Sequence, residues 1–239
     1  MRLSKFVLLI VIGLAFISGM VAHSAIVNHG ISWRRAVGFF VPEEKVRAAI
    51  LSRQTSAQYI ATRDFFAAFP GDSNVVMFGD SQIAFADWPL LLGVPVANRG
   101  IYGETTAAAL LRVNSIVAAH SKCVVTMLGI ADLSVGRSVE STTEDYSVIL
   151  DRLAASGTQI IVQSTLPTEP PYSLNPKVTE LNTKLQAACS RNSRCLFLDL
   201  ERIITPGSTN DGIHLRPSTY KAWAEELKPI ITARCGASQ

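Results

Sequence analysis

The stretch Val75-Val76-Met77-Phe78-Gly79-Asp80-Ser81 determines how the rest of the sequence is interpreted. An apolar run long enough to be a buried strand ends there in a glycine, an aspartate and a serine. In open α/β sheets, ligands bind beyond the carboxyl ends of the strands, and a glycine permits a sharp turn at that point. Ser81 is therefore a candidate nucleophile. The same tripeptide at Gly71-Asp72-Ser73 precedes the apolar run, which predicts a turn at the opposite end of the strand.

Short apolar runs alternate with helical patterns from Asn74 onward. The runs predicted as strands are Val75–Phe78, Val94–Ala97, Val124–Leu128, Ile160–Val162 and Leu196–Leu198. The segments predicted as helices are Glu104–His120, Glu140–Ser156, Lys177–Cys189 and Pro217–Arg234. Continuous apolar strands separated by helices indicate a parallel sheet that is covered on both faces. With right-handed crossovers, this pattern predicts an α/β fold of three α/β/α layers, flavodoxin-like, with a mostly parallel five-stranded sheet.

The composition narrows the classes of protein to which the chain can belong. Of its 239 residues, 48% are hydrophobic and 17% are charged, which excludes low-complexity disorder and provides enough apolar mass for one core. The net charge of +3 is small and scattered, and no basic cluster with interleaved aromatic residues is present. Nucleic acid is therefore not an expected partner. The main domain is expected to span residues 71–239.

The first 27 residues differ from the rest of the chain. Arg2 and Lys5 precede an uncharged apolar run from Phe6 to Ala22, which continues weakly to Val27. Such a start is typical either of a secretory signal peptide that is cleaved or of an N-terminal membrane anchor over residues 6–27. Both alternatives predict export of the remaining chain, to the periplasm or outside the cell. The second also predicts a membrane tether.

Residues 28–70 are predicted to form a linker and a connecting helix. Pro42, Glu43 and Glu44 are typical of a helix start, since proline is tolerated there and acidic residues favour the positive end of the helix dipole. Apolar residues follow at a rough helical period up to Pro70. We expect this helix to cover the flank of the domain without taking part in chemistry.

The four cysteines fit an exported protein. Cys189 and Cys195 bracket a polar loop, Cys123 begins an apolar run and Cys235 ends the last predicted helix. All four are expected at the amino-terminal edge of the strands. We therefore predict the disulfides Cys189–Cys195 and Cys123–Cys235, with free buried thiols as the alternative. No CxxC motif or pair of histidines accompanies them, so neither a zinc site nor another cofactor is predicted.

The loops that follow the predicted strands carry the remaining candidate residues. In a parallel sheet these loops lie at one edge, which brings Asp80-Ser81 close to Asn210-Asp211-Gly212-Ile213-His214. A serine needs a base to lose its proton at neutral pH, and histidine is the usual one. Asp211 precedes His214 by three residues, a spacing that lets a carboxylate hold the far ring nitrogen. Ser81, His214 and Asp211 are thus the candidate catalytic residues.

These blocks resemble the SGNH (GDSL) hydrolases, especially the small esterases similar to platelet-activating-factor acetylhydrolase. The likeness covers about residues 74–231 and rests on Phe78-Gly79-Asp80-Ser81, Asn98-Arg99-Gly100-Ile101-Tyr102-Gly103-Glu104-Thr105 and Asp211-Gly212-Ile213-His214-Leu215. The resemblance implies that Ser81 is the nucleophile, His214 the general base and acid, and Asp211 its orienting carboxylate. It also implies that the amides of Ser81 and Gly103 donate hydrogen bonds to the oxyanion.

One block departs from the pattern of that family. The resemblance leads us to expect Gly-x-Asn-Asp after the third strand, where the asparagine donates a third hydrogen bond to the oxyanion, but this chain reads Gly129-Ile130-Ala131-Asp132. Alanine has no donor, and loss of one such donor typically costs about 10²–10³ in turnover. Gln82, Asn98 and Thr105 are candidate replacements.

The reaction implied by the resemblance is ester hydrolysis through an acyl-enzyme. The expected substrate is an ester of a small acyl group, such as acetate, on a carbohydrate, a lipid or another small molecule. Two alternatives remain: an O-acyltransferase with the same triad, and a weakened or inactive homologue that binds without turnover because of Ala131. Trp88, Tyr102 and Tyr172 are candidates for a substrate pocket, with core packing as the alternative.

Overall fold

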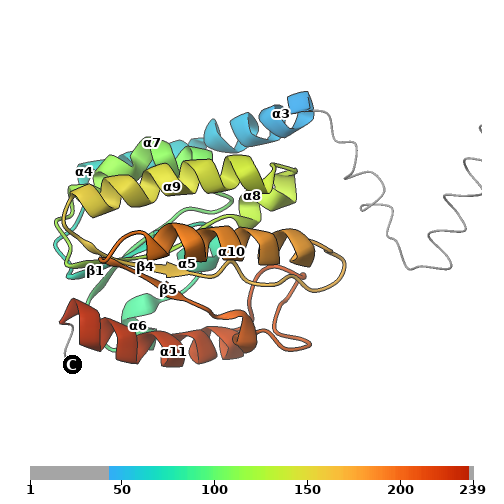
Figure 1. Ribbon diagram of the computed structural model, residues 1–239. Helices are drawn as coiled ribbons and strands as arrows, with labels where there is room; N and C mark the ends of the chain where they lie inside the picture. The colour runs from blue at the N-terminus through green and yellow to red at the C-terminus, as the bar shows by residue number, and fades with distance from the viewer. Residues whose placement is uncertain (1–42, 237–239) are drawn as a thin grey trace, which may run out of the picture. The chain divides into compact units, whose positions relative to one another are not determined.

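The computed structural model of the protein describes residues 43–236 (Figure 1). Within that range, one sheet of five parallel strands has the order β2-β1-β3-β4-β5. The strands are β1 (Val75–Gly79), β2 (Val96–Gly100), β3 (Cys123–Met127), β4 (Gln159–Gln163) and β5 (Cys195–Leu198). The helices are α3 (Glu43–Gln54), α4 (Ala57–Ala68), α5 (Ser81–Ala84), α6 (Trp88–Leu92), α7 (Thr106–Val117), α8 (Ile130–Val135), α9 (Val139–Ala155), α10 (Asn175–Ser190), α11 (Pro217–Cys235) and the short 3-10 helix η1 (Glu201–Ile203). The flavodoxin-like α/β prediction is confirmed.

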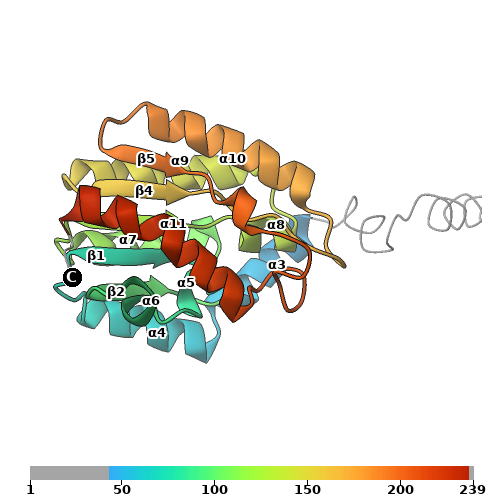
Figure 2. The ribbon, with the colours of Figure 1, turned by 90° about the horizontal axis from the view of Figure 1, so that it is seen from below.

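The central strand shows why the sheet needs helices on both faces. Successive side chains of a strand point to opposite sides, so a strand that is apolar throughout must be covered twice. Val76 and Phe78 of β1 pack in an apolar cluster with residues of α7, α9 and α10. Val75 and Met77 pack in a second cluster with residues of α6 and α11. Figures 1 and 2 show the resulting three layers, with α6 and α11 on one side of the sheet and α7 and α9 on the other.

Strand β2 begins and ends later than the apolar pattern indicates. The prediction was Val94–Ala97, whereas the structure has Val96–Gly100, so Asn98 lies in the strand and not in the following loop. The Asn98 side-chain amide donates to the carbonyls of Ile83 and Ala86, at 3.1 and 3.0 Å. A polar side chain can continue the strand because the segment after β1 satisfies its hydrogen bonds.

The helix predicted before β1 is divided into two, α3 and α4. Ser56 interrupts it with an extended backbone (φ −64°, ψ 142°), and its hydroxyl accepts a hydrogen bond from the Tyr59 amide at 3.2 Å. Serine is among the preferred residues for this N-cap position. Helix α4 packs against α7, and Tyr59 of α4 is buried in a small cluster with Ile101 and Ala108.

Two glycines allow the segment after β1 to fold tightly against the sheet. A Cβ on Gly79 would lie 2.2 Å from the Met127 carbonyl oxygen, and one on Gly100 would lie 2.4 Å from the Ala84 amide nitrogen. Neither distance is tolerated by a real side chain, so both positions require glycine. The absence of these two Cβ atoms lets α5, which begins at Ser81, lie directly against the ends of β1 and β2, and lets β1 end close to the Met127 carbonyl of β3.

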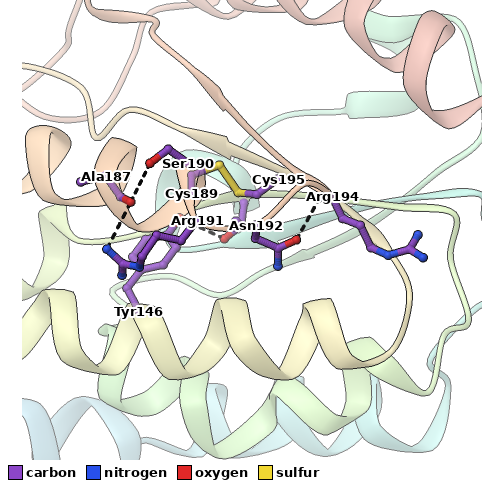
Figure 3. The surroundings of a disulfide bond; sticks show 9 residues. Tyr146, Ala187, Cys189, Ser190, Arg191, Asn192, Arg194 and Cys195 are labelled. Carbon is purple, nitrogen blue, oxygen red and sulfur yellow. Dashed lines mark hydrogen bonds between the residues drawn. A yellow bond between two sulfur atoms is a disulfide. The ribbon is translucent and has the colours of Figure 1, made fainter.

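Both predicted disulfides are present among residues 43–236. Cys123–Cys235 joins the start of β3 to the end of α11, and Cys189–Cys195 joins the end of α10 to the start of β5. Figure 3 shows the second one above a tight polar turn, in which the Asn192 side chain accepts a hydrogen bond from the Arg194 amide. All four cysteines lie at the amino-terminal edge of the strands, as expected.

The predicted signal or anchor over residues 1–27 and the linker up to residue 42 lie outside the described residues. Among the helices of residues 43–236, none has the length and apolarity needed to cross a bilayer.

Asp80 forms the turn between β1 and α5. One oxygen accepts a hydrogen bond from the Gln82 amide at 3.0 Å, which caps α5, while the other has no partner among the described residues. The side chain is fully buried. Burial raises the pKa of Asp80 to about 8, and the hydrogen bond from Gln82 only partly opposes this effect. Asp80 is therefore expected to be largely protonated at neutral pH.

We expect the two disulfides to differ in their effect on stability. The chain-entropy model gives about 5 kcal/mol for the Cys123–Cys235 link and about 2 kcal/mol for Cys189–Cys195, because their sequence separations are 112 and 6. Urea unfolding of Cys123→Ala/Cys235→Ala and Cys189→Ala/Cys195→Ala measures both losses. Equal losses would contradict this entropic assignment.

Asp80 should make the protein less stable as the pH rises. Its pKa is about 8 in the folded protein and near 3.8 when unperturbed, so between these values the folded state binds more protons than the unfolded state. The free energy of unfolding of the wild type, relative to Asp80→Asn, should fall from about pH 4 to 8 with a slope of up to about 1.4 kcal/mol per pH unit. Urea titrations at several pH values measure it. The control is Asp72→Asn, which removes an exposed carboxylate, and an equally steep fall relative to this variant would contradict the assignment to Asp80.

Candidate active site

Three side chains from distant parts of the chain meet at the carboxyl edge of the sheet. Ser81 begins α5 directly after β1, while His214 and Asp211 lie in the loop between η1 and α11. Ser81 Oγ is 3.1 Å from His214 Nε2, although the two residues are 133 positions apart. His214 Nδ1 is 2.7 Å from Asp211 Oδ2. The structure thus brings together the three predicted residues in one hydrogen-bonded series.

Asp211 is held in the orientation that this series needs. Its second oxygen, Oδ1, accepts hydrogen bonds from the backbone amides of Ile213 and His214 at 3.0 and 2.8 Å. Burial raises the pKa of Asp211, but the hydrogen bonds from the His214 ring and from the two amides outweigh it and bring the pKa to about 2. At neutral pH the carboxylate can only accept, so Nδ1 carries the proton and Nε2 is free to accept from Ser81.

Two side chains, one from α5 and one from the loop after β4, brace the segment that carries His214. The side-chain amide of Gln82, the residue after Ser81, donates to the Ile213 carbonyl at 2.6 Å. The Glu169 carboxylate, in the proline-rich loop after β4, accepts from the Gly207 amide at 2.6 Å and from the amide and hydroxyl of Thr209 at 2.7 and 2.6 Å. The hydrogen bond from the Thr209 hydroxyl has the largest effect on Glu169, and together with the bonds from the two amides it lowers the pKa of this carboxyl. The proline-rich loop therefore supports the histidine loop.

Gly103 lies in the loop between β2 and α7 and is fixed by its neighbour Glu104. The Glu104 side chain is fully buried and forms an ion pair with Arg112 of α7. It also accepts a hydrogen bond from the Tyr59 hydroxyl of α4 at 3.1 Å. The connecting helix, for which no chemical role was predicted, thus anchors the loop of a candidate oxyanion donor. A solitary tyrosine in a helical pattern does not reveal this contact.

Ala131 is the second residue of α8 and is buried, with 6% of its surface exposed. The next residue, Asp132, accepts hydrogen bonds from the Thr106 amide and hydroxyl at 2.9 and 2.8 Å. It also pairs with Arg137 at 2.6 Å. Asp132 thus joins α8 to the start of α7, and Ala131 contributes no side-chain donor.

Of the three candidate replacements for the missing donor, Gln82 and Asn98 donate to backbone carbonyls elsewhere, and Thr105 caps a helix. The Gln82 amide donates to the histidine loop, and the Asn98 amide donates to carbonyls after β1. The Thr105 hydroxyl accepts from the Ala108 amide at 3.4 Å as the N-cap of α7, and its side chain is buried. All three side chains thus have a structural contact near the site, and none of these contacts matches the role of the missing asparagine.

Two exposed aromatic side chains flank the histidine. The Tyr102 ring stacks on His214 with centroids 5.8 Å apart, and Phe85 lies 5.3 Å from the same ring. Each is 56% exposed. Trp88, by contrast, is fully buried in the core, and Tyr172 is half-buried. The sequence analysis missed Phe85, although its spacing of four residues from Ser81 places both on one face of a helical turn.

Across residues 43–236, no group of three His, Cys, Asp or Glu side chains is arranged to hold a metal ion.

Comparison with known proteins places this geometry in a family. The model of the GDSL-like lipase/acylhydrolase family matches residues 69–222. A comparison with curated protein sequences finds no match.

Several solved structures share the fold at low sequence identity. A Streptococcus pneumonia protein provisionally described as a platelet activating factor aligns with a TM-score of 0.68 and 20% identity, over 79% of this chain and 97% of that one. A GDSL-like lipase from Bacteroides thetaiotaomicron aligns with a TM-score of 0.58 and 19% identity, over 79% of this chain and 97% of that one. A carbohydrate esterase family 3 protein from Talaromyces cellulolyticus aligns with a TM-score of 0.58 and 16% identity, over 68% of this chain and 97% of that one. With the family model matching most of its length, this chain belongs to the GDSL-like lipase/acylhydrolases, the SGNH hydrolases that its sequence blocks resemble, and is an ester-bond hydrolase.

Proposed function

We propose that Ser81 is the nucleophile of this hydrolase, His214 its general base and acid, and Asp211 the carboxylate that orients the histidine. The observation that carries the proposal is the hydrogen-bonded series from Ser81 Oγ through the His214 ring to Asp211, with steps of 3.1 and 2.7 Å. Both distances lie within the range that proton transfer between a nucleophile and its base requires.

The first half of the reaction forms an acyl-enzyme. The Ser81 hydroxyl proton moves to His214 Nε2 as Oγ bonds to the ester carbonyl carbon, and the carbonyl oxygen becomes an oxyanion. The backbone amides of Ser81 and Gly103 donate to that oxyanion. When the tetrahedral intermediate collapses, the ester C–O bond breaks and His214 gives its proton to the departing alcohol.

The second half regenerates the enzyme. His214 Nε2 removes a proton from water, whose oxygen bonds to the acyl carbon. The bond to Ser81 Oγ then breaks, and the proton on His214 returns to the serine. Asp211 stays ionised throughout, because its hydrogen bonds keep its pKa near 2, and it stabilises the imidazolium that forms in each half.

We infer that the substrate is a short acyl ester, such as an acetyl ester, of a carbohydrate or lipid alcohol. Tyr102 and Phe85 support this choice, since exposed aromatic rings beside the base offer a flat apolar surface to the departing alcohol. The fold similarity to a carbohydrate esterase agrees with it. An O-acyltransferase would use the same residues and pass the acyl group to a sugar hydroxyl in place of water.

We infer in addition that the protein works in an oxidising compartment outside the cytoplasm. Both cysteine pairs are bonded, and structural disulfides persist mainly in such compartments. The apolar segment at residues 6–22 provides a route for export, either as a cleaved signal or as a membrane tether.

Replacing Ser81 should abolish ester hydrolysis. Ser81→Ala removes the attacking oxygen, and we expect the rate of p-nitrophenyl acetate hydrolysis to fall by at least about 10³-fold. The matched control is Ser73→Ala, in the Gly71-Asp72-Ser73 copy, which should retain full activity.

The same assay tests the alternatives. Absence of Ser81-dependent hydrolysis for every short ester would overturn the proposed catalytic role and favour a binding homologue. Transfer to added sugar alcohols in preference to water, measured from the products, would show the acyltransferase instead.

Replacing Asp211 should impair turnover without removing the nucleophile. Asp211→Asn leaves the imidazole free to adopt the other tautomer, and we expect kcat to fall by about 10³–10⁴-fold. Steady-state kinetics measures the change. A loss below tenfold in a folded variant would mean that Asp211 does not orient His214 in the reaction.

A further inference from the structure

The proposed oxyanion hole lacks one hydrogen-bond donor. In the proposed function, the amides of Ser81 and Gly103 supply two donors. The position that carries a third donor in the pattern resembled here is Ala131, and the side chains of Gln82 and Asn98 are used elsewhere. A missing donor at this point would cost about 10²–10³ in turnover.

Arg53 places a cation directly beside the Gly103 loop. A Cβ built on Gly103 would lie 3.4 Å from Arg53 Cδ, 3.7 Å from Nε and 3.8 Å from Nη1. The aliphatic end of the side chain and part of its guanidinium therefore cover the glycine. Tyr102, the residue before it, stacks on His214, so the loop that Arg53 covers also contacts the histidine.

Helix α3, which carries Arg53, also contacts α8, the helix that contains Ala131. Arg53 is in the last turn of α3. Helix α3 thus contacts the Gly103 loop through Arg53, and it also contacts α8, the short helix in which Ala131 lies.

The Arg53 guanidinium is not engaged by a competing partner. Within the part of the chain that the structure describes, its side chain forms neither an ion pair nor a hydrogen bond, and it is exposed. The other arginines near this loop differ, because Arg112 is paired with the buried Glu104 and Arg99 donates to the Phe69 and Pro70 carbonyls. An arginine is always charged and carries five N–H donors. One of these N–H groups can therefore donate to an oxyanion while the aliphatic part of the side chain packs on Gly103.

We propose that Arg53 donates a charge-assisted hydrogen bond to the oxyanion formed on the substrate and so replaces the donor that Ala131 lacks. This inference rests on the proposed catalytic function of Ser81 and Gly103. Because negative charge develops on the carbonyl oxygen only as Ser81 attacks, the guanidinium binds the transition state more strongly than the ground state. Its loss therefore lowers kcat more than it raises KM.

The test is a double-mutant cycle on the Ser81-dependent hydrolysis of p-nitrophenyl acetate, a neutral ester. Arg53→Ala should lower kcat by about 10²–10³-fold, and Arg53→Lys should retain an intermediate rate. Ala131→Asn should change the wild-type rate little. In the Arg53→Ala background the same substitution should restore much of the lost rate, because the two donors serve one oxygen.

The control is Lys45→Ala, which removes an exposed cation from the same helix and should leave the rate unchanged. Thermal unfolding of each variant shows whether α3 or α8 has been destabilised.

Two outcomes would overturn the inference while leaving the proposed function intact. The first is a normal kcat for Arg53→Ala in an enzyme whose activity still depends on Ser81. The second is a rise in KM confined to esters with an anionic acyl group, which would assign Arg53 to substrate recognition. If the wild-type protein shows no Ser81-dependent activity, the proposed function itself fails first.

Discussion

The close approach of backbone to backbone at the end of β1 is the constraint on which the site depends. Gly79 and Gly100 leave no room for a Cβ, so α5 starts in direct contact with β1 and β2. Ser81 is the first residue of that helix, and its position is therefore fixed by the sheet and not by a flexible loop. Asn98 and the Trp88 indole both donate to the Ile83 carbonyl, which locks the same turn. A larger residue at either glycine would displace the nucleophile from its base.

Much of the fold follows from local pattern, because each strand is a short apolar run and each crossover a helical period. The three catalytic candidates were likewise predictable, since Asp211 and His214 are close in sequence and parallel strands bring all following loops to one edge. The error at β2 arose because Asn98 is polar, yet its amide is satisfied by the turn after β1. The contacts of Tyr59, Phe85 and Arg53 could not be predicted in this way. Some of them join elements far apart in the chain and others depend on the direction of a side chain, and the periodicity of apolar residues reports neither property.

The carboxylates around the site show how burial separates structural from chemical roles. Asp80 is fully buried, one of its oxygens has no hydrogen-bond partner among residues 43–236, and its pKa rises to about 8. Asp211 is half exposed and accepts three hydrogen bonds, and its pKa falls to about 2. At neutral pH the nucleophile turn thus contributes little negative charge near Ser81, whereas the charge that faces the imidazolium is retained. This distribution favours the formation of an oxyanion beside the serine.

The long separation between Ser81 and His214 has a consequence for the order in which activity appears. The proposed nucleophile is made early in synthesis, but its proposed base is 133 residues further along, and α11, which follows His214, is joined to β3 by Cys123–Cys235. In the proposed mechanism, a nascent chain therefore carries Ser81 before His214 is present to accept its proton. On the same mechanism, hydrolysis begins only after the last segment has docked, so the appearance of activity reports completion of the whole domain.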